Sequence, residues 1–144
     1  MAQVSPLLSV DDIARSMDYY EKVLRFSKGI ALPGEGGRLM HGEVSIADDI
    51  HLMFMPTQGG EGPIADKLAK GGPKGAGVIL YLNLGDQDID AYFADVKRAG
   101  AKMIEEITDQ FWGDRTFTIE DPDGYVLCFA KHVRDVDFSQ MQHP

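Results

Sequence analysis

The chain repeats one order of elements twice, and the two copies keep an almost constant separation. Ile13 and Ile89 lie 76 residues apart, and Phe54 and Phe129 lie 75 residues apart. In each half an alternating strand is followed by an Asp-rich helix cap, an amphipathic helix and further strands. A constant offset of this kind indicates an internal duplication, so the fold must be assembled from two similar modules.

The first copy is predicted from its periodicity and its turn residues. Alternation over residues 4–10 predicts a strand, and strands at residues 40–47 and 50–55 are separated by the Asp48-Asp49 turn. A further strand is predicted near residues 29–32 of this copy. Apolar residues at helical spacing predict one helix in each copy, with stripes formed by Ile13, Met17 and Tyr20 in the first and by Ile89, Phe93 and Val96 in the second.

The second copy opens with a predicted strand at residues 78–84, and Gly100 ends its helix as a C-cap. Further strands flank the Asp-Pro-Asp-Gly sequence at residues 121–124, which combines residues that favour a tight turn. We therefore divide this single domain into a first module, a Gly- and Pro-rich connector, a second module and a tail, at about residues 1–56, 57–76, 77–133 and 134–144.

Helices that cover only one face of each sheet leave the other face free to line a ligand site. The predicted fold class is α+β, with two pseudo-symmetric modules that form a curved mixed sheet around a cavity. The first helix of each module is expected on the convex side of that sheet.

Charge and composition exclude several classes of function. The chain has 14 Lys and Arg against 23 Asp and Glu, and its net charge of −9 disfavours nucleic-acid binding. No apolar run approaches the length of a membrane span. The N-terminal residues lack the pattern of a signal peptide, and the one cysteine excludes an internal disulfide, so a cytoplasmic location is expected.

Several motifs in this order are shared with a known group of proteins. They are the entry Leu8-Ser9-Val10-Asp11-Asp12, the pair Tyr19-Tyr20, and Trp112-Gly113-Asp114-Arg115 ahead of the turn at residues 121–124. Over nearly its whole length the chain resembles the vicinal oxygen chelate superfamily, which includes glyoxalase I, extradiol dioxygenases, fosfomycin-resistance enzymes and bleomycin-resistance proteins. The resemblance implies two βαβββ modules.

Similar enzymes hold one divalent metal ion with His, Gln or Glu side chains from the first and last strands of each module. The resemblance places these positions on Ser5, Met53, Ile79 or Tyr81, and Cys128. None of these residues offers the imidazole, carboxylate or amide ligands that such an ion requires. The chain thus looks like the non-metal, bleomycin-resistance type of member, for which no cofactor and no catalytic residue is predicted.

His41, Glu43 and His51 form the one cluster that would restore a metal site. If Asp48-Asp49 is a two-residue turn, Ile46 faces His51, and His41 and Glu43 then point to the opposite side of the sheet from His51. A longer turn or a bulge would reverse this parity.

A ligand pocket is predicted at the positions that the resemblance implies, at neighbouring residues of the same strands, and on the loop before the last hairpin. Its residues are Ser5, Leu7, His51, Met53, Tyr81, Trp112 and Cys128, with Phe111 and Arg115 at the rim. Tyr81 and Trp112 are expected to approach from different modules and to hold a flat ring between them.

Several of these residues also have purely structural interpretations, among them a plug on the core for Phe111 and Trp112 and an exposed strand position for His51. Cys128 in an apolar strand is more often a small buried hydrophobe than a reactive thiol. Arg115 is more readily explained by an ion pair with Asp114 or Glu120 than by an anionic ligand, because the chain is rich in acids.

The function predicted from these observations is binding and sequestration of a planar cationic or neutral drug or metabolite, by a protein that resembles homodimeric relatives. Two rivals remain at this point. One is a metal-dependent lyase, isomerase, transferase or dioxygenase with an unusual ligand set. The other is a domain that has lost its ligand and serves only in dimer contacts.

Overall fold

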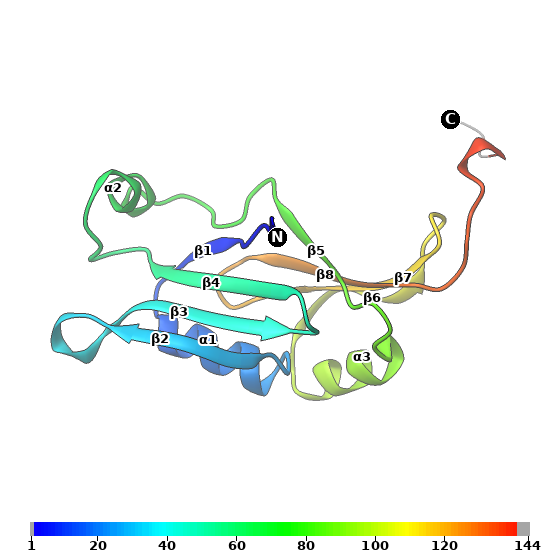
Figure 1. The fold of residues 1–144 in the computed structure, drawn as a ribbon, viewed down its shortest axis with the longest axis horizontal. Coiled ribbons are helices and arrows are strands. Elements are labelled where there is room, and N and C mark those ends of the chain that lie inside the picture. The colour runs from blue at the N-terminus through cyan, green and yellow to red at the C-terminus, as the bar shows by residue number, and fades with distance from the viewer. Residues whose placement is uncertain (1, 141–144) are drawn as a thin grey trace.

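The computed structural model describes residues 2–140, which form two βαβββ modules (Figure 1). The first module consists of β1 (Leu7–Val10), α1 (Ile13–Lys22), β2 (Ser27–Pro33), β3 (Leu39–Ile46) and β4 (Ile50–Pro56). The second consists of β5 (Ile79–Asn83), α3 (Ile89–Arg98), β6 (Lys102–Asp109), β7 (Asp114–Glu120) and β8 (Val126–His132). The predicted α+β class is confirmed.

Each module contributes one four-stranded mixed sheet, and the two sheets have the same topology. The strand orders are β1-β4-β3-β2 and β5-β8-β7-β6, with one parallel pair at β1 and β4 and one at β5 and β8. The strand predicted near residues 29–32 is part of β2, and β6 is its counterpart in the second module. Both modules therefore have the predicted βαβββ order.

The first strand is shorter than its alternation predicted. It begins at Leu7 rather than at residue 4, and the carbonyl of Pro6 accepts a hydrogen bond from the Met53 amide at 2.9 Å. Proline has no amide hydrogen to donate to a neighbouring strand, so it suits the beginning of a strand better than its interior.

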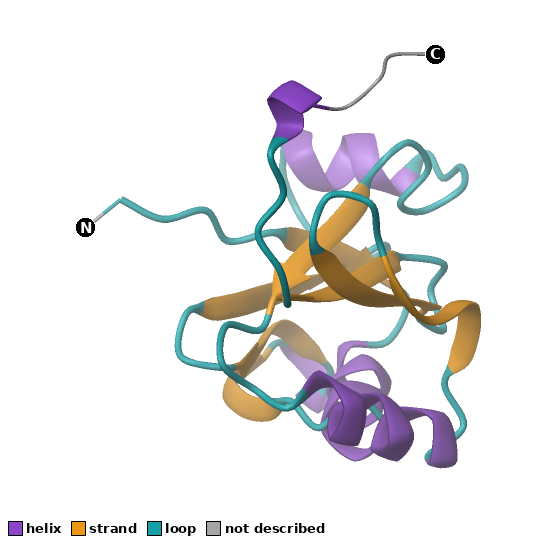
Figure 2. Cartoon of the chain, turned by 90° about the vertical axis from the view of Figure 1, so that its right-hand side faces the viewer, coloured by secondary structure: helices purple, strands orange, loops and turns teal. Residues whose placement is uncertain are grey.

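Helices α1 and α3 cover one face of the two sheets, as predicted (Figure 1, Figure 2). The apolar stripes of both helices are largely buried against strands, with Ile13, Met17, Tyr20, Ile89 and Val96 at most 3% exposed. Gly42 on β3 allows the close approach of α1. A Cβ atom there would lie 2.6 Å from both Ile13 and Met17.

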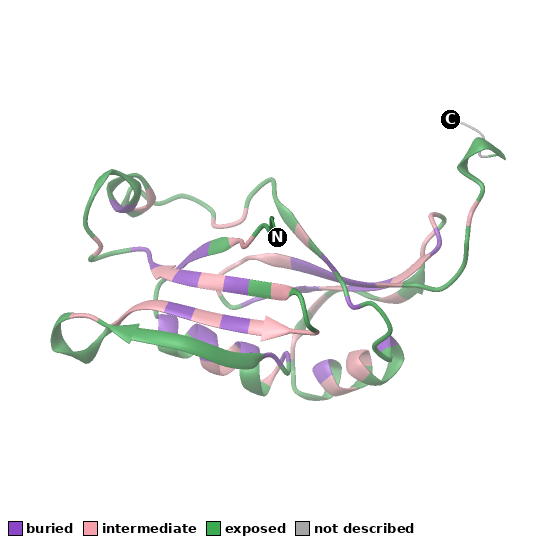
Figure 3. Cartoon of the chain, in the orientation of Figure 1, coloured by how far each residue is buried: buried purple, intermediate pink, exposed green. Residues whose placement is uncertain are grey.

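Burial alternates along the central strands, so that one face of each sheet packs under the helices (Figure 3). We call the other side, turned away from α1 and α3, the open face of each sheet. Strand β2 at the edge of the first sheet is exposed along its whole length.

The two modules meet where the turn at residues 121–124 docks on α1. The Tyr20 hydroxyl donates to Asp121 at 2.7 Å, and the Ser16 hydroxyl donates to Asp123 at 3.0 Å. Arg15 forms an ion pair with Asp123 at 3.0 Å. The turn predicted from the Asp-Pro-Asp-Gly sequence thus joins the second module to the first.

The segment between the modules contains a short helix, α2 (Pro63–Ala69), which stands beside the sheets on the side away from α1 (Figure 1). Lys74 ties the end of this segment to Asp11 at 2.6 Å. Two single turns of 3-10 helix, Glu35–Gly37 and Phe138–Gln140, complete the described elements. None of the described helices is long and apolar enough to cross a membrane.

Candidate functional site

The open face of the first sheet carries the candidate metal ligands of that module. Glu43 pairs with Met53 in the register of β3 and β4, and Ser45 pairs with His51. His41, Glu43 and His51 therefore all belong to the same face. The expectation that His51 points to the opposite side was wrong because residues 47–49 form a three-residue turn, in which Ala47 has a φ of 51°.

His41 and Glu43 form a close pair on this face. Their Nε2 and Oε2 atoms are 2.7 Å apart, and both side chains are about one-third exposed. The neighbouring Leu7 and Met53 are in register and add apolar surface. Within residues 2–140, however, no group of three His, Cys, Asp or Glu side chains converges closely enough to hold a metal ion.

The open face of the second sheet is built around Tyr81. Tyr81 pairs with Cys128 across β5 and β8, and Cys128 pairs with Thr118 on β7. Asp114 pairs with His132 at the end of the same face. By alternation and register, the residues that share this face include Ile79, Tyr81, Glu105, Asp114, Thr116, Thr118, Glu120, Cys128 and His132.

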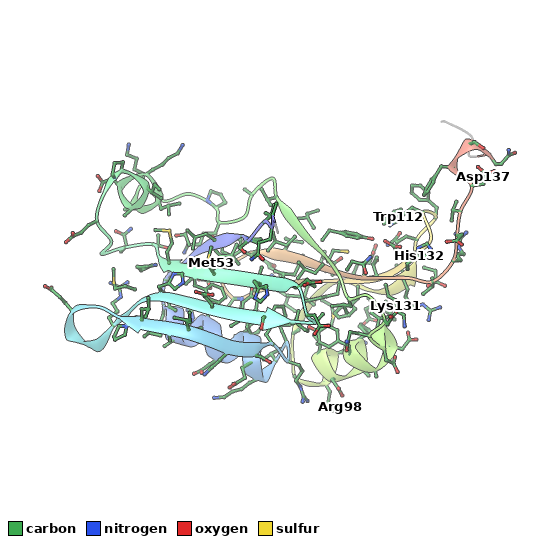
Figure 4. All side chains as sticks on the ribbon, in the orientation of Figure 1. Met53, Arg98, Trp112, Lys131, His132 and Asp137 are labelled. Atoms are coloured by element: carbon green, nitrogen blue, oxygen red, sulfur yellow. The ribbon has the colours of Figure 1, made fainter. Side chains whose placement is uncertain are left out.

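A chain of hydrogen bonds joins the aromatic and acidic groups at this end. Trp112 Nε1 donates to the Tyr81 hydroxyl at 3.0 Å, and that hydroxyl donates to Asp114 Oδ2 at 2.5 Å. Asp114 Oδ1 lies 3.3 Å from His132 Nδ1, and His132 Nε2 lies 2.7 Å from Asp135. Figure 4 shows Trp112 and His132 at the same end of the molecule, far from Met53.

This chain overturns the prediction that Tyr81 and Trp112 approach from different modules. Both belong to the second module, and their polar atoms are in contact. A flat ring cannot be held between two side chains that touch each other. A ligand ring must therefore stack on the part of the indole that Tyr81 leaves free, or on the ring of Phe111. The Phe111 ring is perpendicular to the indole, and the two ring centroids are 4.9 Å apart.

The surroundings of this chain change the acidity of its members. Partial burial, and next the hydrogen bond to Asp114, raise the pKa of Tyr81 to about 12. The carboxylates of Asp135 and then of Asp114 raise the pKa of His132 above its usual value. Tyr81 therefore keeps its proton at neutral pH, and the imidazolium form of His132 is favoured between its two acidic neighbours.

Arg115 lies away from the candidate site. Its guanidinium binds Asp109 at 2.6 and 3.2 Å and Asp90 of α3 at 3.0 Å, on the helix-covered side of the sheet. The structural interpretation of Arg115 thus fits these contacts, with partners other than the predicted Asp114 and Glu120. Asp109 in turn has its pKa lowered by the hydrogen bond from Arg115.

Cavities lie where the two modules approach each other along β1 and β5. One of about 250 Å³ is lined by His51 from the first module and by Ile79 and Tyr81 from the second. Another of about 360 Å³ lies beside Leu7, Leu80 and the end of the connector. A wider hollow of about 640 Å³ is formed by residues 73–79 with Glu120, Asp123, Gly124 and Val126.

The remaining predicted positions are placed less closely together. Ser5 precedes β1 and accepts a hydrogen bond from Gln3 at 3.2 Å. Leu7 is 48% exposed on the open face, and Phe111 is 66% exposed beside Trp112. Sequence reasoning missed Asp114, His132 and Asp135 as members of the site. Asp114 was considered only as a partner of Arg115, although its alternation with Thr116 and Thr118 places it on the other face.

Cys128 is 8% exposed, and burial raises the pKa of its thiol. Because the thiolate is the reactive form, we expect iodoacetamide to alkylate the native protein at pH 8 at least about tenfold more slowly than the urea-unfolded protein. Mass spectrometry of timed samples measures both rates, and free cysteine in the same buffers serves as the control. Equal rates would show that Cys128 is an accessible nucleophile.

Comparison with known proteins points to one family. The model of the Glyoxalase/Bleomycin resistance protein/Dioxygenase superfamily matches residues 2–129. The chain is also 31% identical over 146 residues to an uncharacterized protein of Mycobacterium bovis, a match that spans 96% of this chain and 89% of that protein. A protein of Mycobacterium tuberculosis strain H37Rv is equally similar, with 96% and 79% covered.

Solved structures share the fold at lower sequence identity. TioX from Micromonospora sp. ML1 superposes with a TM-score of 0.67 at 20% identity, over 92% of this chain and all of that chain. A glyoxalase/bleomycin resistance protein/dioxygenase from Nocardioides gives a TM-score of 0.67 at 14% identity, over 99% and 92% of the two chains. A superfamily member from Sphaerobacter thermophilus gives 0.66 at 20% identity, over 91% and 98%.

Proposed function

The chain belongs to the glyoxalase/bleomycin resistance protein/dioxygenase superfamily, and from that premise we propose that it binds and sequesters a small planar molecule without using a metal ion. The observation that carries this proposal is the open face of the second sheet. There Tyr81 and Phe111 are 46% and 66% exposed, beside Trp112 and a partly shielded carboxylate. Exposed aromatic surface with a few fixed polar groups is typical of ligand sites.

The chemistry of the available donors supports binding without a metal. The four positions that hold the ion in similar enzymes fall on a hydroxyl, a thioether, an apolar or phenolic side chain, and a buried thiol. None of these is a strong ligand for a divalent Lewis acid at neutral pH. The net charge of −9 favours a cationic or neutral ligand over an anionic one.

A metal-dependent enzyme is the second candidate, and one observation favours it. His41, Glu43 and His51 share the open face of the first sheet, and the first two are already 2.7 Å apart. A modest rearrangement, or side chains from a second copy, would be needed to complete a ligand set. The cytoplasmic location expected from the sequence does not depend on the choice between these two functions.

We also propose that the protein pairs as a homodimer, as similar proteins do. Large apolar side chains remain exposed along the first strand of each sheet and the residue before it, with Leu7 at 48%, Val78 at 59% and Ile79 at 64%. Contiguous apolar surface of this kind commonly marks a contact between subunits. Pairing would cover these edges and deepen the cavities beside them.

Trp112 is the only tryptophan, so its fluorescence reports directly on the proposed site. We expect at least one compound in a panel of cationic aromatic antibiotics and aromatic metabolites to quench it saturably. Binding measured by calorimetry should weaken at least tenfold in Trp112→Ala, a loss of about 1.4 kcal/mol. Ile30→Ala on the exposed edge strand β2 serves as the control and should bind normally.

Two outcomes would contradict the proposal. Binders whose affinity is indifferent to Trp112 and Tyr81 would place the ligand elsewhere. A reproducible rise in melting temperature with nickel, zinc, manganese or iron, abolished in His51→Ala or Glu43→Gln, would favour the metal-dependent enzyme, because an ion bound only to the native state stabilises it.

A further inference from the structure

The loop that presents Phe111 and Trp112 is held in place by backbone hydrogen bonds. The Gln110 amide donates to the Asp114 carbonyl at 2.7 Å, and the Gly113 amide donates to the Gln110 carbonyl at 3.1 Å. Its carbonyl groups in turn accept from the C-terminal segment, with Val133 and Arg134 amides at 2.9 and 3.2 Å from Gly113. The aromatic side chains are thus displayed to solvent on a fixed backbone, which lowers the entropic cost of binding to them.

The aromatic rings of this loop form a corner. Phe111 and Trp112 are perpendicular, at 89°, and the Tyr81 hydroxyl lies 3.0 Å from the indole nitrogen. The carboxylate of Asp114 accepts from this Tyr81 hydroxyl at 2.5 Å, and only 15% of its side chain is exposed. We define the aromatic corner as Tyr81, Phe111, Trp112 and Asp114.

The charged groups around the corner leave it electronegative when His132 is neutral. Asp114 of β7 and Asp135 of the C-terminal segment face His132 from either side, and the Tyr81 hydroxyl of β5 reaches the same carboxylate. Arg134 is a neighbouring cation, and its guanidinium faces the carbonyls of Gln110 and Phe111 at 3.3 and 3.4 Å. Glu105 of β6 belongs to the same face, because it pairs with Thr118, and its carboxylate accepts from the Gln110 side chain at 2.9 Å. The carboxylates of Asp114, Asp135 and Glu105 thus outnumber the guanidinium of Arg134.

We propose that the aromatic corner binds the ammonium end of an organic cation, with aromatic faces around the charge and Asp114 as its counter-ion. Aromatic faces attract cations through their quadrupoles, most strongly when the cation is alkylated and weakly hydrated. A partly shielded carboxylate adds a Coulombic attraction that a neutral ligand does not feel. This inference rests on the proposed function and narrows its ligand class from cationic or neutral to cationic.

His132 couples this site to pH. Protonation of its imidazole places a positive charge between Asp114 and Asp135 and lowers the net negative charge of the corner. A bound cation and the proton on His132 therefore compete for the same carboxylate. Binding should weaken as the pH falls through the raised pKa of His132.

The test uses two probes of the same shape that differ in charge, 3-hydroxyphenyltrimethylammonium and its neutral carbon isostere 3-tert-butylphenol. Quenching of Trp112 fluorescence gives both affinities in the intact protein. We expect the cation to bind at least about tenfold more tightly at pH 8. We expect about a fivefold loss of cation affinity at pH 5.5 in the wild type and no such loss in His132→Gln.

Asp114→Asn should lower the affinity for the cation about tenfold and leave the affinity for 3-tert-butylphenol within about twofold. Tyr81→Phe removes the hydroxyl that donates to Asp114 but keeps the ring and the carboxylate. It is the control for a general disturbance of the corner and should retain the preference for the cation. Equal affinities for the two probes in the wild type would overturn the inference and leave the proposed function standing. Failure of both probes and of the wider panel to bind would overturn both.

A contact between subunits is the competing role for these exposed rings. If Phe111→Ala converts a dimer to a monomer in sedimentation measurements, the corner is part of the subunit interface and the inference is wrong. An unchanged sedimentation coefficient together with weakened binding of the ammonium probe would support it.

Discussion

Asp121→Ala is expected to lower the free energy of unfolding by about 3 kcal/mol, because it leaves several buried donors without a partner. Asp121 is 4% exposed. Its carboxylate accepts from the Tyr20 hydroxyl at 2.7 Å and from the amides of Asp123 and Tyr125, both at 2.9 Å. Removal of this carboxylate breaks the hydrogen bonds within the turn and also the hydrogen bond to Tyr20 of α1, so both modules are affected.

Urea denaturation of Asp121→Ala, Asp121→Asn, Tyr20→Phe and the double variant with Asn and Phe measures this effect and separates its parts. Asparagine keeps one acceptor for the two amides, so Asp121→Asn should cost less than Asp121→Ala. The double-mutant cycle of Tyr20→Phe and Asp121→Asn should give a coupling energy of about 1–2 kcal/mol. A loss below about 0.5 kcal/mol in Asp121→Ala would show that the junction does not stabilise the fold.

The same carboxylate makes a specific contribution to pH dependence. Burial raises the pKa of Asp121 above its ordinary value, against the opposing effect of its hydrogen bonds. The stability it contributes is therefore fully present below the unfolded value of about 3.9 and is lost as the pH rises through the folded pKa. Relative to Asp121→Asn, the wild type should be more stable at pH 4 than at pH 7.

Gly113→Ala is expected to cost about 3 kcal/mol, mainly by forcing the C-terminal segment away from the loop that carries Trp112. Gly113 has a φ of 101°, and a Cβ atom there would lie 2.3 Å from the carbonyl oxygen of Arg134. Backbone atoms on both sides cannot yield as a flexible side chain would. The amides of Val133 and Arg134, which donate to the Gly113 carbonyl, should then lose their protection.

Gly100→Ala provides a matched control for this prediction. Gly100 has a φ of 96°, but a Cβ atom there would meet nothing within 4 Å. It carries the same backbone penalty, about 1 kcal/mol, without the collision. Hydrogen exchange should show faster exchange at residues 133 and 134 in Gly113→Ala alone, and equal losses of stability in the two variants would contradict the close contact.

The architecture was predictable because it is written twice in the sequence. The constant offset between the halves fixed the order of elements, and the stripes of both helices matched the faces that the structure buries. The turn at residues 121–124 was identified from its residue types alone. Its docking on α1 was not, because nothing local indicates that Asp121 meets a tyrosine 101 residues earlier.

The errors at the site have local physical causes. The turn at residues 47–49 contains no glycine, yet Ala47 adopts a positive φ, and this one additional turn residue moves His51 to the face of Glu43. Alternation correctly exposed Tyr81 but could not show that its hydroxyl reaches Trp112 rather than facing it across a cavity. The placement of Trp112 depends on a loop fixed by the C-terminal segment, which local sequence patterns do not reveal.

The duplication preserves the strands but not the chemistry on them. In the matched positions of the two open faces, His41 and Glu43 correspond to Thr116 and Thr118, and Met53 corresponds to Cys128. The fold is nearly two-fold symmetric, yet a molecule turned end over end within it would meet thioether and imidazole where it had met phenol and indole. A ligand long enough to contact both open faces would therefore meet different groups at its two ends, so under the proposed binding function one of its two orientations would be preferred.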